Sequence, residues 1–172
     1  GDVDLFMSAV GHNYLFRNDK GRFHNVTQAA GVAGAKDAWS TSCGWFDYNN
    51  DGKLDLVVCN YVQWSRKIDK LQDFRLVGVG RAYGPPTAFV GTYPYLYRND
   101  GNGKFTDVSK EAGLQVNSGS SKQPLSKGMG LLPIDVDGDG HMEIIIANDT
   151  SQNMLFRNNK NGTFKEFARL AG

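Results

Sequence analysis

The chain has 172 residues, which is enough for one domain with a sizeable core. Its 19 Lys and Arg nearly balance its 18 Asp and Glu, giving a formal net charge of +1. This balance argues against charge-driven binding to nucleic acid or anionic membranes, which depends on a basic excess. No run approaches the ~20 apolar residues of a membrane span. The 21 glycines and 12% aromatic residues favour an all-β fold rich in turns.

One phrase occurs three times along the chain, each time followed by a glycine-containing turn, a phenylalanine and a closing Ala-Gly. The copies begin at Tyr14–Asn18, Tyr95–Asn99 and Met154–Asn158. A second, Asp-rich phrase precedes the first: residues 47–58 match residues 135–146, and residues 1–6 match the end of that phrase. We therefore expect the first unit to lack its opening strand and half of its loop.

The spacing of these phrases divides the chain. Arg98 and Arg157 are 59 residues apart, whereas Arg17 and Arg98 are 81 apart, so the second unit holds 22 additional residues. All units belong to one expected domain. They are a partial unit over 1–32, a unit over 33–114 with an insertion at about 61–94, and a unit over 115–172.

Each complete unit is expected to contain four short strands separated by turns rich in Gly, Asn and Asp. In the third unit they are predicted at residues 130–134, 143–147, 153–157 and 163–167. Four antiparallel strands per unit is the pattern of a β-propeller blade. Blades bury their faces only against neighbouring blades, and rings have four to eight of them, so about three blades are expected to be a fragment of a larger propeller.

Oxygen-bearing side chains alternate along the two complete Asp-rich loops. They are Asp47, Asn49, Asp51 and Asp55 in the second unit, and Asp135, Asp137, Asp139 and Glu143 in the third. Alternate residues of a tight loop can turn towards a common centre, as in calcium loops. Gly52 and Gly140 come directly after the third oxygen-bearing residue of each loop, where the chain must bend sharply. The next residue, Lys53 or His141, would offer its backbone carbonyl, with the Lys53 side chain pointing to solvent.

Oxygen donors without Cys or an inward-facing His suit Ca²⁺ better than zinc or copper, and Mg²⁺ demands stricter octahedral geometry. The third-unit loop has four carboxylates and the second-unit loop has three, so we expect the third-unit loop to bind Ca²⁺ more tightly. An EF-hand is excluded because its twelfth position, a bidentate Glu, is occupied by Val58 or Ile146. Ordinary hairpin turns are the alternative. The register of both loops with the repeat favours a metal.

These phrases resemble the FG-GAP repeats (VCBS-type repeats in bacterial proteins) of integrin α-subunit propellers. The closing phrase, Leu-Phe-Arg-Asn, Gly-Thr-Phe and Ala-Gly, resembles the cartilage acidic protein group and its bacterial relatives. The resemblance implies a seven-bladed propeller with Ca²⁺ between the first two strands of a blade. It also implies a secreted, periplasmic or cell-surface location and an adhesion or scaffolding role, with a protein partner or the remaining blades of a longer parent chain.

The resemblance carries ligand roles onto both complete loops. The implied ligands are Asp47, Asn49, Asp51, the Lys53 carbonyl and Asp55, and then Asp135, Asp137, Asp139, the His141 carbonyl and Glu143. In the first unit only Asp2 and Asp4 remain.

A second class of function is a propeller enzyme, a hydrolase or lyase whose catalytic residues lie outside this fragment. Within the sequence, His12, His24 and His141 fall at different phases of the repeat, without zinc spacing or a catalytic partner. We therefore expect a binding protein and not an enzyme.

The insertion and the cysteines leave alternatives open. Apolar residues at helical spacing predict a short helix within 66–76. The insertion either faces a partner or packs over the blade edge with its aromatic residues buried.

Cys43 and Cys59 are equidistant from the centre of the predicted hairpin, so they could face each other across adjacent strands. They form a disulfide or are two small buried apolar residues.

Overall fold

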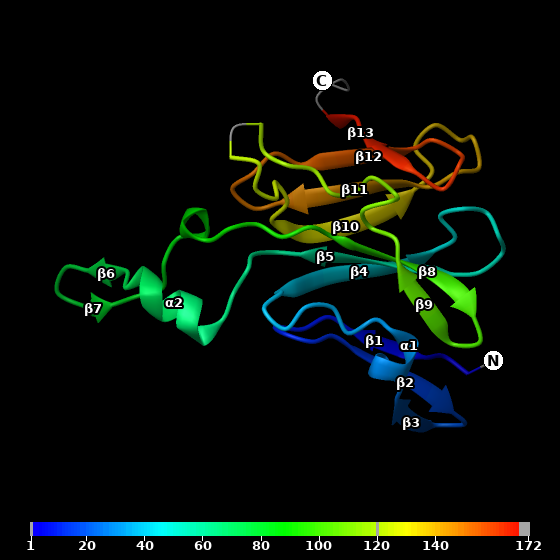
Figure 1. Cartoon of the computed structure of the whole chain (residues 1–172), viewed down its shortest axis with the longest axis horizontal. Coiled ribbons are helices and arrows are strands. Elements are labelled where there is room, and N and C mark those ends of the chain that lie inside the picture. Colours follow the sequence, from blue (N-terminus) through cyan, green and yellow to red (C-terminus); the bar gives the residue numbers. More distant parts are fainter. Residues whose placement is uncertain (1, 120, 169–172) are drawn as a thin grey trace.

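Three antiparallel sheets stack face to face in chain order in this computed structural model, which describes residues 2–119 and 121–168 (Figure 1). Strand makes up 41% and helix 9% of the structure, so the predicted all-β propeller fragment is confirmed. We call the three sheets blade 1, blade 2 and blade 3. The closing Ala171-Gly172 of the repeat lies outside the described residues.

The strands of each blade are neighbours in chain order. Blade 1 contains β1 (Leu5–Met7), β2 (Tyr14–Asp19) and β3 (Arg22–Asn25), followed by the short helix α1 (Thr27–Ala30). Blade 2 contains β4 (Ser40–Phe46), β5 (Asp55–Asn60), β8 (Tyr95–Gly101) and β9 (Lys104–Asp107). Blade 3 contains β10 (Gly128–Ile134), β11 (Glu143–Asn148), β12 (Met154–Asn158) and β13 (Phe164–Glu166). The blade 3 strands lie within two residues of the predicted bounds.

The core consists of two layers, one on each side of blade 2. Successive strand residues point to opposite faces, so Leu56 and Val58 of β5 pack towards blade 1 while Val57 and Cys59 pack towards blade 3. All six residues of β5 are buried. We call the two layers interface 1–2 and interface 2–3.

The two cysteines lie on different faces of blade 2, so the expectation that they could face each other is wrong. In the β4–β5 hairpin Phe46, and not Asp47, pairs with Asp55, so that Cys43 pairs with Val58 and not with Cys59. Cys43 packs at interface 1–2, whereas the Cys59 thiol points towards the Gly130 carbonyl of blade 3 at 3.8 Å. Both thiols are free. Burial raises the pKa of the Cys59 thiol to about 12.

The insertion projects sideways from the stack (Figure 1). Its elements are α2 (Arg66–Gln72), the hairpin β6 (Arg75–Leu76) and β7 (Gly80–Arg81), and the 3-10 turn η1 (Pro86–Ala88). The predicted helix is present. It begins after Ser65, whose hydroxyl accepts from the Ile68 N–H, and ends at Asp73 in a left-handed conformation with φ 36°.

The aromatic residues of the insertion divide between the two predicted roles. Tyr83 is 90% exposed, whereas Trp64 is half-buried and packs edge-on against Trp39 beside the blade. Within the described ranges, every helix is too short or too polar to cross a bilayer.

Candidate metal centre

The loop between β10 and β11, which we call loop 3, gathers three acidic side chains. Carboxylate oxygens of Asp135, Asp137 and Glu143 all lie within 4.8 Å of one another. Asp135 begins the loop and binds its turn: Oδ1 accepts from the Gly138 and Asp139 N–H groups at 2.7 and 3.1 Å, and Oδ2 accepts from the Gly140 N–H at 2.9 Å. The chain therefore folds around the first carboxylate of the loop.

The loop between β4 and β5, which we call loop 2, repeats this turn. Asp47 accepts from the Asp51 N–H at 3.1 Å and from the Gly52 N–H at 2.7 Å. Gly52 and Gly140 have φ of 82° and 84°, the left-handed conformation in which glycine meets no Cβ penalty. The predicted role of these two glycines is confirmed. Asn49 stands where loop 3 has Asp137, and its side-chain oxygen accepts from the Asp51 N–H at 3.2 Å.

The last acid of each loop is buried and held by backbone N–H groups. Glu143 is 4% exposed and accepts from the Val136 and Asn158 N–H groups at 3.0 and 3.3 Å. Asp55 is fully buried and accepts from the Tyr48 and Asn99 N–H groups at 3.1 and 2.7 Å. Burial raises the pKa of Asp55, and the nearby Asp51 and Asp47 charges add to this, against the two hydrogen bonds. A cation in the loop would favour the ionised carboxylate.

Cationic side chains lie against both loops, and one of them corrects an expectation. The Lys53 ammonium does not point to solvent alone but pairs with Asp51 Oδ2 at 2.9 Å. In loop 3, Lys160 pairs with Asp139 at 2.7 Å and Arg157 lies 3.4 Å from Asp137. These pairs lower the pKa of Asp51 and Asp139. Each exposed pair is worth only about 0–1 kcal/mol, so a divalent cation can compete with it.

The His141 side chain lies between loops. Its Nδ1 is 3.3 Å from Asn50 Nδ2, which also donates to the Gly140 carbonyl at 3.2 Å. Loop 2 and loop 3 are therefore in direct contact across interface 2–3. This contact joins residues about 90 positions apart, so sequence spacing gave no sign of it.

Asparagines of the repeated Arg-Asn phrase support the loops, a role that sequence reasoning missed. Asn158 Nδ2 donates to the Met142 carbonyl at 3.1 Å, and Asn99 Nδ2 donates to the Leu54 carbonyl at 3.0 Å. Asn18 Nδ2 donates to the Val3 carbonyl at 3.0 Å in the same way. The available signal was the presence of Asn at one repeat position in all three units.

Asp2 and Asp4 of the first unit are exposed and bind the neighbouring hairpin. Asp2 accepts from the Lys20 N–H at 2.7 Å, and Asp4 accepts from the Asn18 N–H at 2.8 Å. Asp4 therefore occupies the position of the last acid, as Asp55 and Glu143 do in the complete loops.

A family model described as an FG-GAP-like repeat matches residues 1–58 and 135–172, which is more than half of the chain. The chain belongs to the FG-GAP-like repeat family. No curated protein matches it. The unmatched residues 59–134 include the whole insertion.

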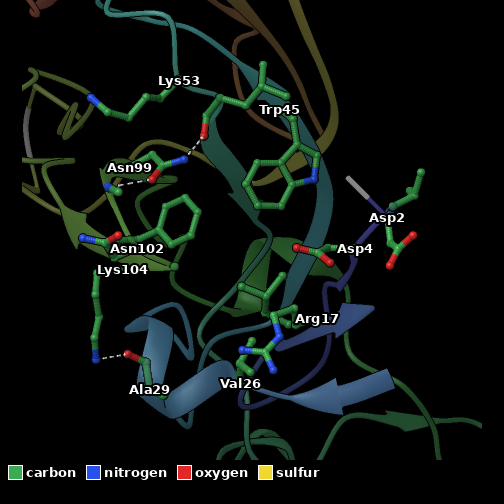
Figure 2. Close-up of a pocket in the computed structure, with 16 residues that line it drawn as sticks. Asp2, Asp4, Arg17, Val26, Ala29, Trp45, Lys53, Asn99, Asn102 and Lys104 are labelled. Atoms are coloured by element: carbon green, nitrogen blue, oxygen red, sulfur yellow. Dashed lines mark hydrogen bonds between the residues drawn. The ribbon is translucent and has the colours of Figure 1, made fainter. Parts of the chain in front are cut away.

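A cavity of about 710 Å³ lies between the first two FG-GAP blades, on the loop side of the stack (Figure 2). Figure 2 shows Asp2 and Asp4 on one side of it, Trp45 above it, and Asn99 opposite. Asn99 binds the Leu54 carbonyl there, and Lys104 Nζ donates to the Ala29 carbonyl at 2.6 Å. The cavity is separate from the acidic cluster of loop 3.

Proposed function

We propose that this chain is a Ca²⁺-binding part of a propeller that acts as a protein-interaction, adhesion or scaffold module outside the cytoplasm, either secreted, periplasmic or at the cell surface. The observation that supports it best is loop 3, where three carboxylates converge within 4.8 Å. Oxygen donors of this type suit Ca²⁺, which takes six to eight oxygen ligands in flexible geometry. The FG-GAP-like repeat itself supports an interaction role.

Three of the proposed loop 3 ligands, Asp135, Asp137 and Glu143, converge in a donor set that fits the ion, and loop 2 matches loop 3 by repeat position. In loop 3 the ligands would be Asp135, Asp137, Asp139, the His141 carbonyl and Glu143. Loop 2 would use the matching set of Asp47, Asn49, Asp51, the Lys53 carbonyl and Asp55. Bound Ca²⁺ would neutralise the acids and hold the first hairpin of a blade closed.

We propose binding and not catalysis as the role of these units. The three histidines support this because they do not share a neighbour: His12 lies beside the Gly34 carbonyl, His24 beside Asp19 and His141 beside Asn50. The repeat phrases also support kinship with the cartilage acidic protein group, whose placement outside the cytoplasm agrees with a Ca²⁺ requirement.

Calorimetric titration with Ca²⁺, combined with thermal melting in chelator, tests the proposal. Wild type should bind Ca²⁺ and melt at higher temperature in its presence, because a ligand that binds only the folded state stabilises it. The double variant Asp135→Asn with Asp137→Asn should lose the tighter site. Glu111→Gln, which removes an exposed acid outside the loops, is the matched control. If chelator leaves the melting temperature of wild type unchanged, the proposal is wrong.

A further inference from the structure

The far end of the insertion carries apolar side chains into solvent. Val77 is fully exposed and Val79 is 73% exposed in the turn that joins β6 and β7, and Leu71 in the last turn of α2 is 75% exposed. Gly78 and Gly80 give this turn its left-handed residues, with φ of 79° and 90°. Glycine with Asn, Asp or Ser is the usual composition of a tight turn, so the fold itself does not require valine here. Apolar side chains gathered in one exposed place mark an interaction site.

Hydrogen bonds hold this end of the insertion in a defined place. Arg81 of β7 donates to the Asp69 carbonyl of α2 at 3.1 Å, which joins the hairpin to the helix. At the base, the Gln63 N–H donates to the Val90 carbonyl at 2.8 Å, which joins the two chain segments that lead into and out of the insertion. Figure 1 shows the β6–β7 hairpin as the outermost part of the insertion, with α2 between it and the blades. The apolar turn is therefore presented ahead of the rest of the molecule.

Positive charge is concentrated around the apolar turn. Residues 66–83, which we call the tip, contain five Lys and Arg and only two Asp, although the whole chain is nearly neutral. Both acids are already used, since they pair with Arg75 and Arg81. The other three cations have no ion-pair partner among the described residues; they are Arg66, Lys67 and Lys70. These three side chains and Leu71 line one groove on α2. They are available to an anionic partner.

An anionic bilayer surface matches this chemistry better than a protein partner does. Stable interfaces between proteins use about 20–30 residues a side, more than the tip contains, and Lys is depleted from such interfaces. A bilayer surface accepts apolar side chains at the boundary of headgroups and acyl chains, and its anionic headgroups attract Lys and Arg. Tyr83, which is 90% exposed, is of the type enriched at this boundary.

We propose that the tip binds the surface of a bilayer that contains anionic phospholipid. The side chains of Val77 and Val79 enter the boundary region, and the cations of α2 behind them reach the lipid phosphates on their flexible stems. The near-neutral charge of the whole chain does not oppose this, because salt limits charge interactions at a surface to about 8–10 Å. Figure 1 shows the insertion at the end of the stack opposite loop 2 and loop 3, so both loops stay in solvent when the tip is bound.

Vesicle flotation tests the proposal. The whole chain is mixed with phosphatidylcholine vesicles that contain about 30% phosphatidylglycerol, or with pure phosphatidylcholine vesicles, at low and at physiological salt without added divalent cation. The tip variant is Val77→Ser with Val79→Ser, and the charge variant is Lys67→Gln with Lys70→Gln. Circular dichroism monitors the folding of every variant.

Matched controls change the same residue types outside the insertion. Phe23→Ser removes an apolar side chain that is 53% exposed on β3. Lys110→Gln with Lys165→Gln removes two exposed cations. A variant with added apolar surface, Val77→Leu with Val79→Leu, tests for a gain of binding.

Wild type should float with the anionic vesicles, and its partition should fall about tenfold or more on pure phosphatidylcholine. The tip variant should lose about tenfold or more on the anionic vesicles, because it removes two apolar side chains from the boundary. The charge variant should lose a similar factor and show a weaker dependence on salt. The leucine variant should bind more tightly than wild type, and both controls should bind as wild type does.

Three results would overturn the proposal. Failure of wild type to bind the anionic vesicles would assign the tip to a protein partner instead. Equal partition of the tip variant and wild type would place the lipid contact elsewhere on the molecule. Equal partition of wild type into anionic and neutral vesicles would show that the cations of α2 take no part. If a serine variant fails to fold, the leucine variant decides, and unchanged binding by it counts against the proposal.

Discussion

The two interfaces of this molecule are built from the same repeat but bury different amounts of it. Among the described residues, the cluster at interface 2–3 holds thirteen buried residues and the cluster at interface 1–2 holds seven. Phe105 and Phe164 occupy the same repeat position, yet Phe164 is buried and Phe105 is half-buried. The difference is the strand-and-turn segment with Phe46 and Tyr48. In repeat proteins, the contribution of a residue to stability depends on the neighbouring unit as well as on its own unit.

Some features are common to both interfaces because they depend only on the backbone. Gly31 and Gly113 close the repeat units, and both have φ of 84°. A Cβ on Gly31 would lie 2.9 Å from the Phe105 carbonyl oxygen, and one on Gly113 would lie 2.6 Å from that of Phe164. The Ala-Gly ending of the repeat is thus the place where the chain of one blade approaches the last strand of the next.

The largest expected difference is in the phenylalanine series of the repeat. Phe164→Ala should cost about 3–5 kcal/mol of unfolding free energy, as for a fully buried Phe. Phe105→Ala should cost about 1–2 kcal/mol because half of its burial is missing. Phe23→Ala, at 53% exposure, should stay within about 0.5 kcal/mol. Urea unfolding of the three variants measures this. Equal losses at Phe105 and Phe164 would contradict the comparison.

The asparagine series should show a smaller difference of the same kind. Asn158→Ala should cost about 2–3 kcal/mol, because it leaves the Tyr48 and Met142 carbonyls without their donor in a buried place. Asn99→Ala removes one such bond and should cost about 1 kcal/mol. Denaturant unfolding again gives the values. Asn158→Asp, which keeps the acceptor oxygen but loses the donor, should behave like Asn158→Ala, and a mild effect would show that the amide donor is unimportant.

Calcium should distinguish the two loops. At a free Ca²⁺ concentration ten times the Kd, one site should add about 1.4 kcal/mol. Loop 3 should bind more tightly than loop 2 because it has one more carboxylate. Asn49→Asp should therefore raise the affinity of loop 2 about tenfold, since ligand charge tunes calcium loops. Calorimetry measures both sites, and Asn50→Asp serves as a charge control beside the proposed ligands. Equal affinity of wild-type and Asn49→Asp loops would speak against the donor assignment.

The smallest expected effect is a pH dependence from loop 2 in chelator. Burial raises the pKa of Asp55 in the folded chain. Between the unfolded pKa and this raised value, the folded chain keeps a proton that the unfolded chain has lost, so this carboxyl's contribution to stability falls as pH rises. The lowered pKa values of Asp51 and Asp139 act in the opposite sense, and their contributions are lost as pH falls.

Thermal melts from acidic to neutral pH separate these contributions. In chelator, wild type should gain stability relative to Asp55→Asn as the pH falls through the raised pKa. Saturating Ca²⁺ should suppress that trend because it holds the carboxylate ionised. A constant difference between the two proteins at every pH would show that Asp55 ionisation does not influence folding.

Much of the local structure could be predicted from the sequence because it depends on short-range chemistry. Strand alternation, turn glycines and the spacing of acids predicted the blade strands, the left-handed Gly52 and Gly140, and the close approach of Asp135, Asp137 and Glu143. The side-chain partners of the loops could not be predicted in this way. Lys160 reaches Asp139 from a different turn, and Asn50 reaches His141 from a different blade.

The sequence by itself determined the repeat, its register and the acidic loops, because these follow from residue type and spacing along one unit. Only the tertiary structure decided which residues of the neighbouring blades each unit packs against. The register of the β4–β5 hairpin, in which Cys43 pairs with Val58, placed Cys43 and Cys59 on opposite faces. Stacking of blades turned Asn158 into a bridge between loops and left its counterpart Asn99 beside a cavity. Identical phrases acquire different burial because the apolar surface removed from water depends on the neighbouring blade.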